Sequence, residues 1–169
     1  IAPDREPRAA RNRLGLDPVA TTVALLPGSR HSETARLAGP MIEAARQLGS
    51  RRGGLQFVAA MASESIEAGF RAEMQRLEFD RIRLVQGDPR TVIAAGDVVL
   101  CASGTATLEV MLVNRPMVMT YKVSPSTFRL GRALRLVKLR WFSLPNILAG
   151  EGLVPEPLNH KPVKGNNFE

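Results

Sequence analysis

The feature that most constrains the fold of this chain is an apolar run at 98–101 that ends abruptly in small residues. The run is short enough for a strand that is buried on both faces, and Ser103 and Gly104 follow it closely. A helix is predicted to begin at once with Thr105 as its N-cap, and a second buried strand is predicted at 116–120. A strand that passes directly into a helix and then into another strand indicates a parallel α/β sheet.

The turn formed by Ser103, Gly104 and Thr105 is predicted to bind an anion. The first N–H groups of a helix have no partner within the helix, and a glycine lets a ligand approach the backbone closely. In a parallel sheet such a turn lies at the carboxyl ends of the strands, where ligands bind. The alternative, from residue types alone, is an ordinary strand-to-helix turn in which Ser or Thr serves as a cap.

Glu109 stands four residues after Thr105, one helical turn beyond the predicted anion site. At that spacing a carboxylate can accept hydrogen bonds from both hydroxyls of a ribose that is attached to the bound phosphate. The alternative for a lone glutamate on a helix is a solvated surface position.

A second strand-to-helix turn has a similar layout near the start of the chain. A predicted strand at 22–26 leads into Gly28, Ser29 and Arg30, and a helix is predicted over 33–48. Arg30 can pair with a phosphate through two parallel hydrogen bonds. Because the full P-loop motif is absent, a Pro-Gly turn with a solvated arginine is the alternative.

Further strands are predicted at 55–61 and 82–85, and the helices between strands begin at Ser63, Asp88 and Thr105. This alternation predicts a doubly wound parallel α/β sheet, and 169 residues fit one compact domain. No glycine-rich dinucleotide fingerprint follows the first strand, so a dinucleotide-binding Rossmann domain is disfavoured.

The remaining composition excludes several classes of protein. No apolar run approaches the length of a membrane-spanning helix, and a cytoplasmic location is expected. The only cysteine, Cys101, falls within a predicted strand, which argues for a buried thiol rather than a disulfide or a nucleophile. His31, His160 and Cys101 have no spacing suited to a metal site, so no metal is expected.

The positive charge of the chain is concentrated after the last predicted strand. Six cations without a carboxylate account for all but one of the net charge of +7: Lys122, Arg129, Arg132, Arg135, Lys138 and Arg140. From about Pro125 they alternate with apolar residues at helical spacing, which predicts a cationic amphipathic helix. Membrane or lipid contact is predicted for Arg129, Arg132, Arg135, Lys138 and Trp141. The alternative is a helix packed on the sheet with a solvated basic face; nucleic-acid binding is not expected, because aromatic residues are few.

Four motifs taken together carry a resemblance to a known family. The stretches 25–33, 102–109, 116–122 and 143–150, the last followed by 154–156, resemble in order and spacing the C-terminal half of bacterial lipid-A-disaccharide synthase. The resemblance implies the nucleotide-sugar-binding half of a GT-B fold, with a UDP-sugar donor-binding domain at 1–156. The tail at 157–169 does not continue the family pattern and is expected to be irregular or foreign to the family.

The resemblance also implies an activity. Members of the family transfer 2,3-diacylglucosamine from its UDP donor to 2,3-diacylglucosamine 1-phosphate, forming a β-1,6-linked disaccharide and UDP at the inner face of the cytoplasmic membrane. The implied donor-binding residues are Ser29, Arg30, Gln86, Ser103, Gly104, Thr105, Glu109 and Asn146. N–H groups and an arginine would stabilise the departing UDP without a metal or another cofactor.

The catalytic base is expected in an N-terminal domain that this chain does not contain. The 169 residues alone are therefore expected to be inactive as a transferase. The alternative function is a non-catalytic module that binds a nucleotide or an anionic lipid.

Overall fold

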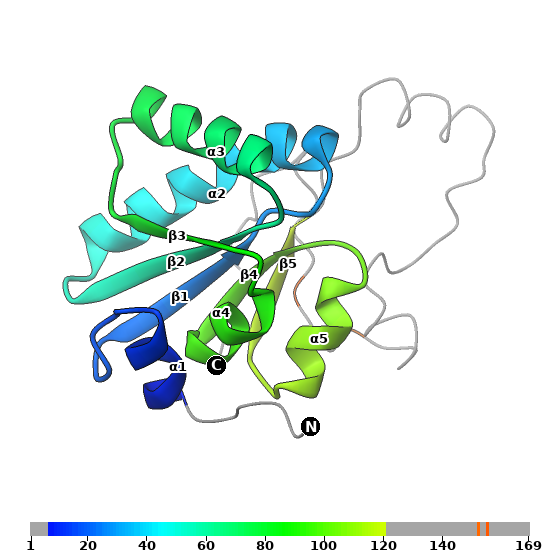
Figure 1. The fold of residues 1–169 in the computed structure, drawn as a ribbon. Coiled ribbons are helices and arrows are strands. Elements are labelled where there is room, and N and C mark those ends of the chain that lie inside the picture. Colours follow the sequence, from blue (N-terminus) through cyan, green and yellow to red (C-terminus); the bar gives the residue numbers. More distant parts are fainter. Residues whose placement is uncertain (1–6, 121–151, 153–154, 156–169) are drawn as a thin grey trace.

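The computed structural model describes residues 7–120 together with Gly152 and Pro155. Helices and strands alternate along the described chain (Figure 1): α1 (Pro7–Arg13), β1 (Thr21–Leu26), α2 (His31–Arg51), β2 (Leu55–Met61), α3 (Glu64–Arg76), β3 (Ile82–Gln86), α4 (Pro89–Ala95), β4 (Val98–Ala102), α5 (Ala106–Leu112) and β5 (Met117–Thr120). Each predicted strand is present to within one residue at either end, because each coincides with an apolar run bounded by turn residues.

The strands form one parallel sheet in the order β3-β2-β1-β4-β5. Strand β1 lies at the centre, with Val23 opposite Phe57 of β2 on one side and opposite Val98 of β4 on the other. The chain therefore winds outward from β1 to β3, returns to the centre, and winds outward again from β4 to β5. The predicted doubly wound, Rossmann-like sheet is confirmed, and its direction of winding reverses between β1 and β4.

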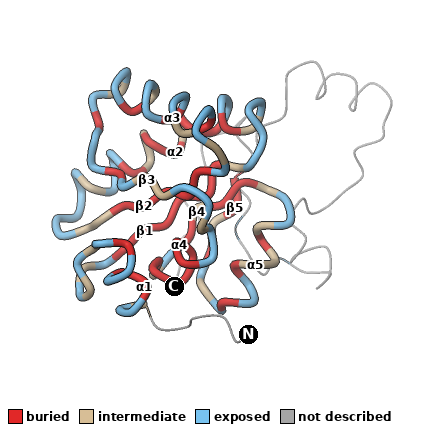
Figure 2. Tube along the Cα trace, viewed as in Figure 1, coloured by how far each residue is buried: buried red, intermediate tan, exposed pale blue. Residues whose placement is uncertain are grey.

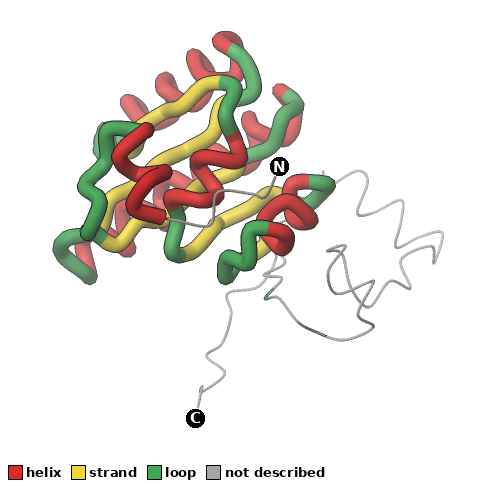
Figure 3. The backbone as a smooth tube through the Cα atoms, turned by 60° about the horizontal axis from the view of Figure 1, so that its bottom comes forward, coloured by secondary structure: helices red, strands yellow, loops and turns green. Residues whose placement is uncertain are grey.

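The helices cover both faces of the sheet (Figures 1 and 3). Helices α2 and α3 pack on one face around Phe57 and Phe70, whereas α1, α4 and α5 pack on the other around Val58 and Val99. Figure 2 shows that the strands are largely buried, while the outward sides of α2 and α3 are exposed. Strands covered in this way are mainly apolar on both faces, as in β1 and β4, whereas the edge strand β3 carries exposed Arg83 and Gln86.

Two of the three predicted helix caps are confirmed. Ser63 accepts a hydrogen bond from the N–H of Ile66 at 3.3 Å, and Asp88 accepts one from the N–H of Thr91 at 3.1 Å. The prediction that the Thr105 side chain caps α5 is wrong: its hydroxyl makes no capping bond. Thr105 already has helical backbone angles, φ −61° and ψ −27°, whereas a capping side chain needs an extended backbone to reach back to the first turn.

The buried Arg11 connects α1 to residues near the amino ends of β1 and β4. Arg11 donates from Nε to the carbonyl of Ala95 at 2.9 Å and from Nη1 to the carbonyl of Pro18 at 3.2 Å. Its Nη2 lies 2.7 Å from Oδ2 of Asp97, which also accepts the N–H of Thr22 at 2.8 Å. One carboxylate thus connects α1, β1 and the residue that precedes β4.

The outer edge of β5 has a neighbour from later in the chain. The N–H of Met119 donates to the carbonyl of Pro155 at 3.1 Å. The predicted cationic helix near Pro125, the loop that holds Asn146, and the tail at 157–169 lie outside the described residues. Among the described helices, none combines the length and the apolar character needed to cross a membrane.

Candidate functional site

A cleft of about 450 Å³ opens where the sheet reverses its direction of winding, at the carboxyl ends of the strands. Its wall comes from four strand ends that are far apart in the sequence. The residues that line it outside the strands include Gly28, Ser29, Arg30, Glu33, Ala62, Gly87, Pro89, Ser103, Gly104, Thr105 and Glu109. The structure therefore brings together the two turns that were predicted to bind phosphate.

The turn between β4 and α5 presents backbone to this cleft. Gly104 has φ +136°, a region that favours glycine, and a Cβ built there would meet no atom within 4 Å. The N–H of Ser103 is taken up by the carbonyl of Thr120 at 3.2 Å, so Ser103 can offer a ligand its hydroxyl but not its N–H. The hydroxyl of Thr107 donates to the carbonyl of Gly104 at 2.7 Å and holds the turn in this shape.

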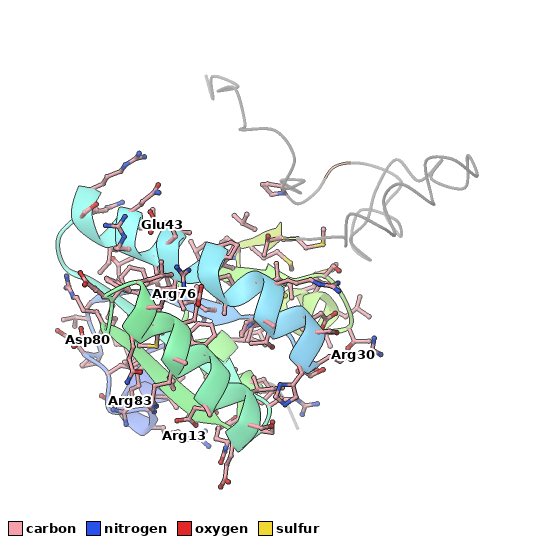
Figure 4. All side chains as sticks on the ribbon, turned by 90° about the horizontal axis from the view of Figure 1, so that it is seen from above. Arg13, Arg30, Glu43, Arg76, Asp80 and Arg83 are labelled. Atoms are coloured by element: carbon pink, nitrogen blue, oxygen red, sulfur yellow. The ribbon has the colours of Figure 1, made fainter. Side chains whose placement is uncertain are left out.

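The facing turn, between β1 and α2, is shaped by a second glycine. Gly28 has φ +104°, and Oε2 of Glu33 lies 2.6 Å from the position that a Cβ on Gly28 would occupy. Arg30 takes the N-cap position of α2 with an extended backbone. Its exposed guanidinium, which has only N–H donors, can donate to an anionic ligand in the cleft. Figure 4 shows Arg30 at the start of α2, with the labelled Glu43 towards the other end of that helix.

Two charged residues were missed by the sequence analysis, one in the cleft lining and one beside a lining residue. Glu33 lines the cleft from the first turn of α2. Arg90, in α4, places Nε at 3.9 Å from Oε2 of Glu109. The position of Glu33 five residues after a Pro-Gly turn was a usable signal, because a carboxylate in a first helical turn can fold back over that turn. For Arg90 the only signal was its position at the predicted start of a helix, directly after Asp88 and Pro89.

Two predicted donor residues remain, Gln86 and Asn146. Gln86 is exposed at the end of β3, and its neighbour Gly87 lines the cleft while Gln86 itself does not. Asn146 lies outside the described residues. Among the residues that the structure describes, no group of three His, Cys, Asp or Glu side chains is arranged to hold a metal ion.

Cys101 is buried beneath the cleft, as its strand position predicted. Burial raises the pKa of its thiol to about 12, and the charge of Glu109 adds to this shift. At pH 8 the thiolate is then on the order of one part in ten thousand. We expect Ellman's reagent to leave the folded chain unmodified and to titrate one thiol per chain after unfolding in guanidinium chloride. Rapid reaction of the folded chain would contradict this burial.

Comparison with known proteins gives a consistent result. The LpxB family, lipid-A-disaccharide synthetase, matches residues 1–166. The lipid-A-disaccharide synthase of Xylella fastidiosa (strain M23) is 47% identical over 149 residues, covering 87% of this chain and 39% of that protein. The lipid-A-disaccharide synthase of Colwellia psychrerythraea (strain 34H) is 49% identical over 150 residues, covering 88% of this chain and 38% of that protein.

Among solved structures, Anabaena Alr3699/HepE in complex with UDP and glucose aligns with a TM-score of 0.49 at 17% identity, covering 73% of this chain and 35% of that chain. At this TM-score and identity, nothing about the cleft is inferred from the similarity. The chain spans about two fifths of the length of the curated relatives it matches. With the family match along nearly all of its residues and close to half of its aligned positions identical, the chain belongs to the lipid-A-disaccharide synthase family.

Proposed function

We propose that this chain is the donor-binding half of a GT-B hexosyltransferase. The complete enzyme would transfer 2,3-diacylglucosamine from UDP-2,3-diacylglucosamine to 2,3-diacylglucosamine 1-phosphate, forming the β-1,6-linked lipid A disaccharide and UDP. The proposal rests on the cleft, which Arg30 lines from the β1–α2 turn and Glu109 lines from α5. The family match supports the same proposal.

Each part of the cleft has a proposed role. The N–H groups of Gly104 and Thr105 and the hydroxyl of Ser103 would hold the diphosphate, and Ser29 with Arg30 would meet it from the facing turn. Glu109 would accept hydrogen bonds from the ribose hydroxyls. Negative charge grows on UDP as the glycosidic bond breaks, and donors fixed in advance around the diphosphate lower the energy of that transition state. The catalytic base and the acceptor contacts would come from the rest of the longer protein.

The lipid substrates imply a membrane surface, and we place the enzyme at the inner face of the cytoplasmic membrane as a peripheral protein. Support comes from the clustering of cations between Lys122 and Arg140, directly after β5. A basic segment of this kind is attracted to anionic headgroups. The cleft would then accept a donor whose acyl chains stay in the bilayer.

Titration of the chain with UDP by isothermal calorimetry tests the donor site. We expect Glu109→Ala to weaken UDP binding about fivefold to tenfold, because a hydrogen bond to a charged group contributes about 1.5 kcal/mol or more and exposure of this carboxylate reduces that value. The same variant is expected to lose the preference for UDP over 2′-deoxy-UDP. Glu64→Ala is the matched control, an exposed first-turn glutamate of α3 outside the cleft lining.

An absence of UDP binding by the unmodified chain would refute the donor-site proposal. A second arm uses the longer protein with its upstream half: incubated with both lipid substrates, it is expected to release UDP, and Glu109→Ala is expected to slow that release. A longer protein that binds UDP but never releases it from the donor would support the non-catalytic alternative.

A further inference from the structure

The charges that line the cleft do not match a diphosphate alone. Arg30 is the only cation among the described lining residues, whereas Glu33 and Glu109 are both carboxylates. A nucleoside diphosphate is itself an anion, so each carboxylate opposes its binding unless it faces a hydrogen-bond donor on the ligand. In the proposed function, Glu109 accepts hydrogen bonds from the ribose hydroxyls. Glu33 has no partner in that arrangement.

The side chain of Glu33 lies over the β1–α2 turn. Its backbone N–H donates to the carbonyl of Arg30 at 3.0 Å, and its carboxylate lies against Gly28, whose missing side chain leaves the room for it. Glu33 is only partly exposed, and its carboxylate makes no hydrogen bond or ion pair with any described residue. By contrast, Glu109 has Arg90 at 3.9 Å. The carboxylate oxygens of Glu33 therefore remain available as hydrogen-bond acceptors towards the cleft.

The two carboxylates line the cleft from two different helices. Glu33 lies in the first turn of α2, which follows Ser29 and Arg30, and Glu109 lies in α5, which follows Ser103 and Gly104. If the phosphates of a ligand bridge the two turns and its ribose meets Glu109, Glu33 is the remaining carboxylate of the lining that its other phosphate substituent can meet. In a nucleotide sugar that substituent is the sugar.

We propose that Glu33 is a specificity-determining residue that accepts hydrogen bonds from the hydroxyl or N–H groups of the donor sugar and disfavours free UDP. This inference rests on the proposed function. The terminal phosphate of UDP has a second ionisation with a pKa of about 6, so free UDP carries one more negative charge above that pH than a sugar diphosphate does. Glu33 repels that extra charge, whereas a sugar replaces it with neutral donors. The same carboxylate thus retains the substrate and favours release of the product.

Calorimetric titration with two soluble probes, UDP and UDP-N-acetylglucosamine at pH 8, tests this role. Glu33→Gln is expected to bind UDP about twofold to fivefold more tightly, because one like charge is removed. Its preference for the sugar nucleotide over UDP is expected to fall about tenfold. A substitution that only loosened the turn would weaken the binding of both probes. Tighter binding of UDP together with weaker binding of UDP-N-acetylglucosamine therefore distinguishes the proposed role from a loss of structure.

Two further variants separate the effect of charge from that of side-chain length and provide a control. Glu33→Asp retains the charge on a side chain shorter by one methylene, and we expect it to lose preference for the sugar while UDP binding stays weak. Glu64→Gln, in the first turn of α3, is the matched control and should leave both affinities unchanged. Thermal unfolding of each variant checks that α2 and the sheet are intact.

The outcomes separate the two claims. An unchanged ratio of UDP to UDP-N-acetylglucosamine affinity in Glu33→Gln, with UDP still bound, overturns this inference and leaves the proposed function standing. Equal weakening of both probes also overturns it. If the unmodified chain binds neither probe, the proposed function fails and this inference fails with it.

Discussion

Replacing Asp97 with alanine is expected to lower the free energy of unfolding by about 3 kcal/mol. The substitution removes the counter-ion of the buried Arg11, which costs about 3–5 kcal/mol when a pair is fully enclosed. It also takes away the acceptor of the Thr22 N–H, a loss of about 1–3 kcal/mol. The lower ends of these two ranges sum to about 4 kcal/mol. Because the Asp97 side chain is 41% exposed, water replaces part of both interactions, and the expected loss falls somewhat below that sum. Urea denaturation followed by circular dichroism measures the change.

Two companion variants separate charge from hydrogen bonding at this position. Asp97→Asn keeps an acceptor for the Thr22 N–H and is expected to lose about half as much stability. Asp80→Ala, at an exposed position before β3, should change stability by no more than about 0.5 kcal/mol. A loss in Asp97→Ala as small as that of Asp80→Ala would mean that Arg11 is satisfied by the two carbonyls alone.

Arg30→Ala is expected to weaken UDP binding by about 10- to 100-fold. A hydrogen bond between a guanidinium and a phosphate contributes about 1.5–3 kcal/mol, and each 1.4 kcal/mol corresponds to about a tenfold change in affinity. Arg30→Lys should recover only part of the loss, because a lysine keeps the charge but not the paired donors. Isothermal calorimetry at two salt concentrations gives the affinities and their electrostatic part.

Arg36→Ala provides the matched control for this measurement. Arg36 is an exposed arginine on the same helix, six residues after Arg30, and does not line the cleft. Its removal changes the net charge equally, so it reports any general electrostatic attraction of UDP. Similar losses in Arg30→Ala and Arg36→Ala would argue against a phosphate contact at Arg30.

The sheet could be predicted from the sequence because its strands are enclosed on both faces. Continuous apolar runs such as 22–26 and 55–61 then coincide with strands, and the helical stretches between them leave a parallel sheet as the simplest arrangement. The meeting of the turns at Arg30 and Gly104 followed from the same reasoning, because carboxyl ends of parallel strands share one edge.

The side chains that line the cleft could be predicted only in part, because their positions depend on local backbone angles. Helix α2 begins at His31, two residues before the predicted start, and the carboxylate of Glu33 in its first turn lies against Gly28. The helical angles of Thr105 removed its expected capping role. The backbone angles of Thr105 have no signature in residue spacing alone, whereas the place of Glu33 shortly after a Pro-Gly turn was a usable signal.

The hydrogen bond between Met119 and Pro155 has a consequence for the stretch of chain between them. Strand β5 ends at Thr120, and Pro155 accepts a hydrogen bond from Met119 of the same strand. The entropy cost of closing such a loop grows slowly, by about 0.6 kcal/mol for each doubling of its length. Insertions or deletions between Thr120 and Pro155 should therefore leave the geometry of the strand ends unchanged, so the length of this stretch can vary without altering the cleft.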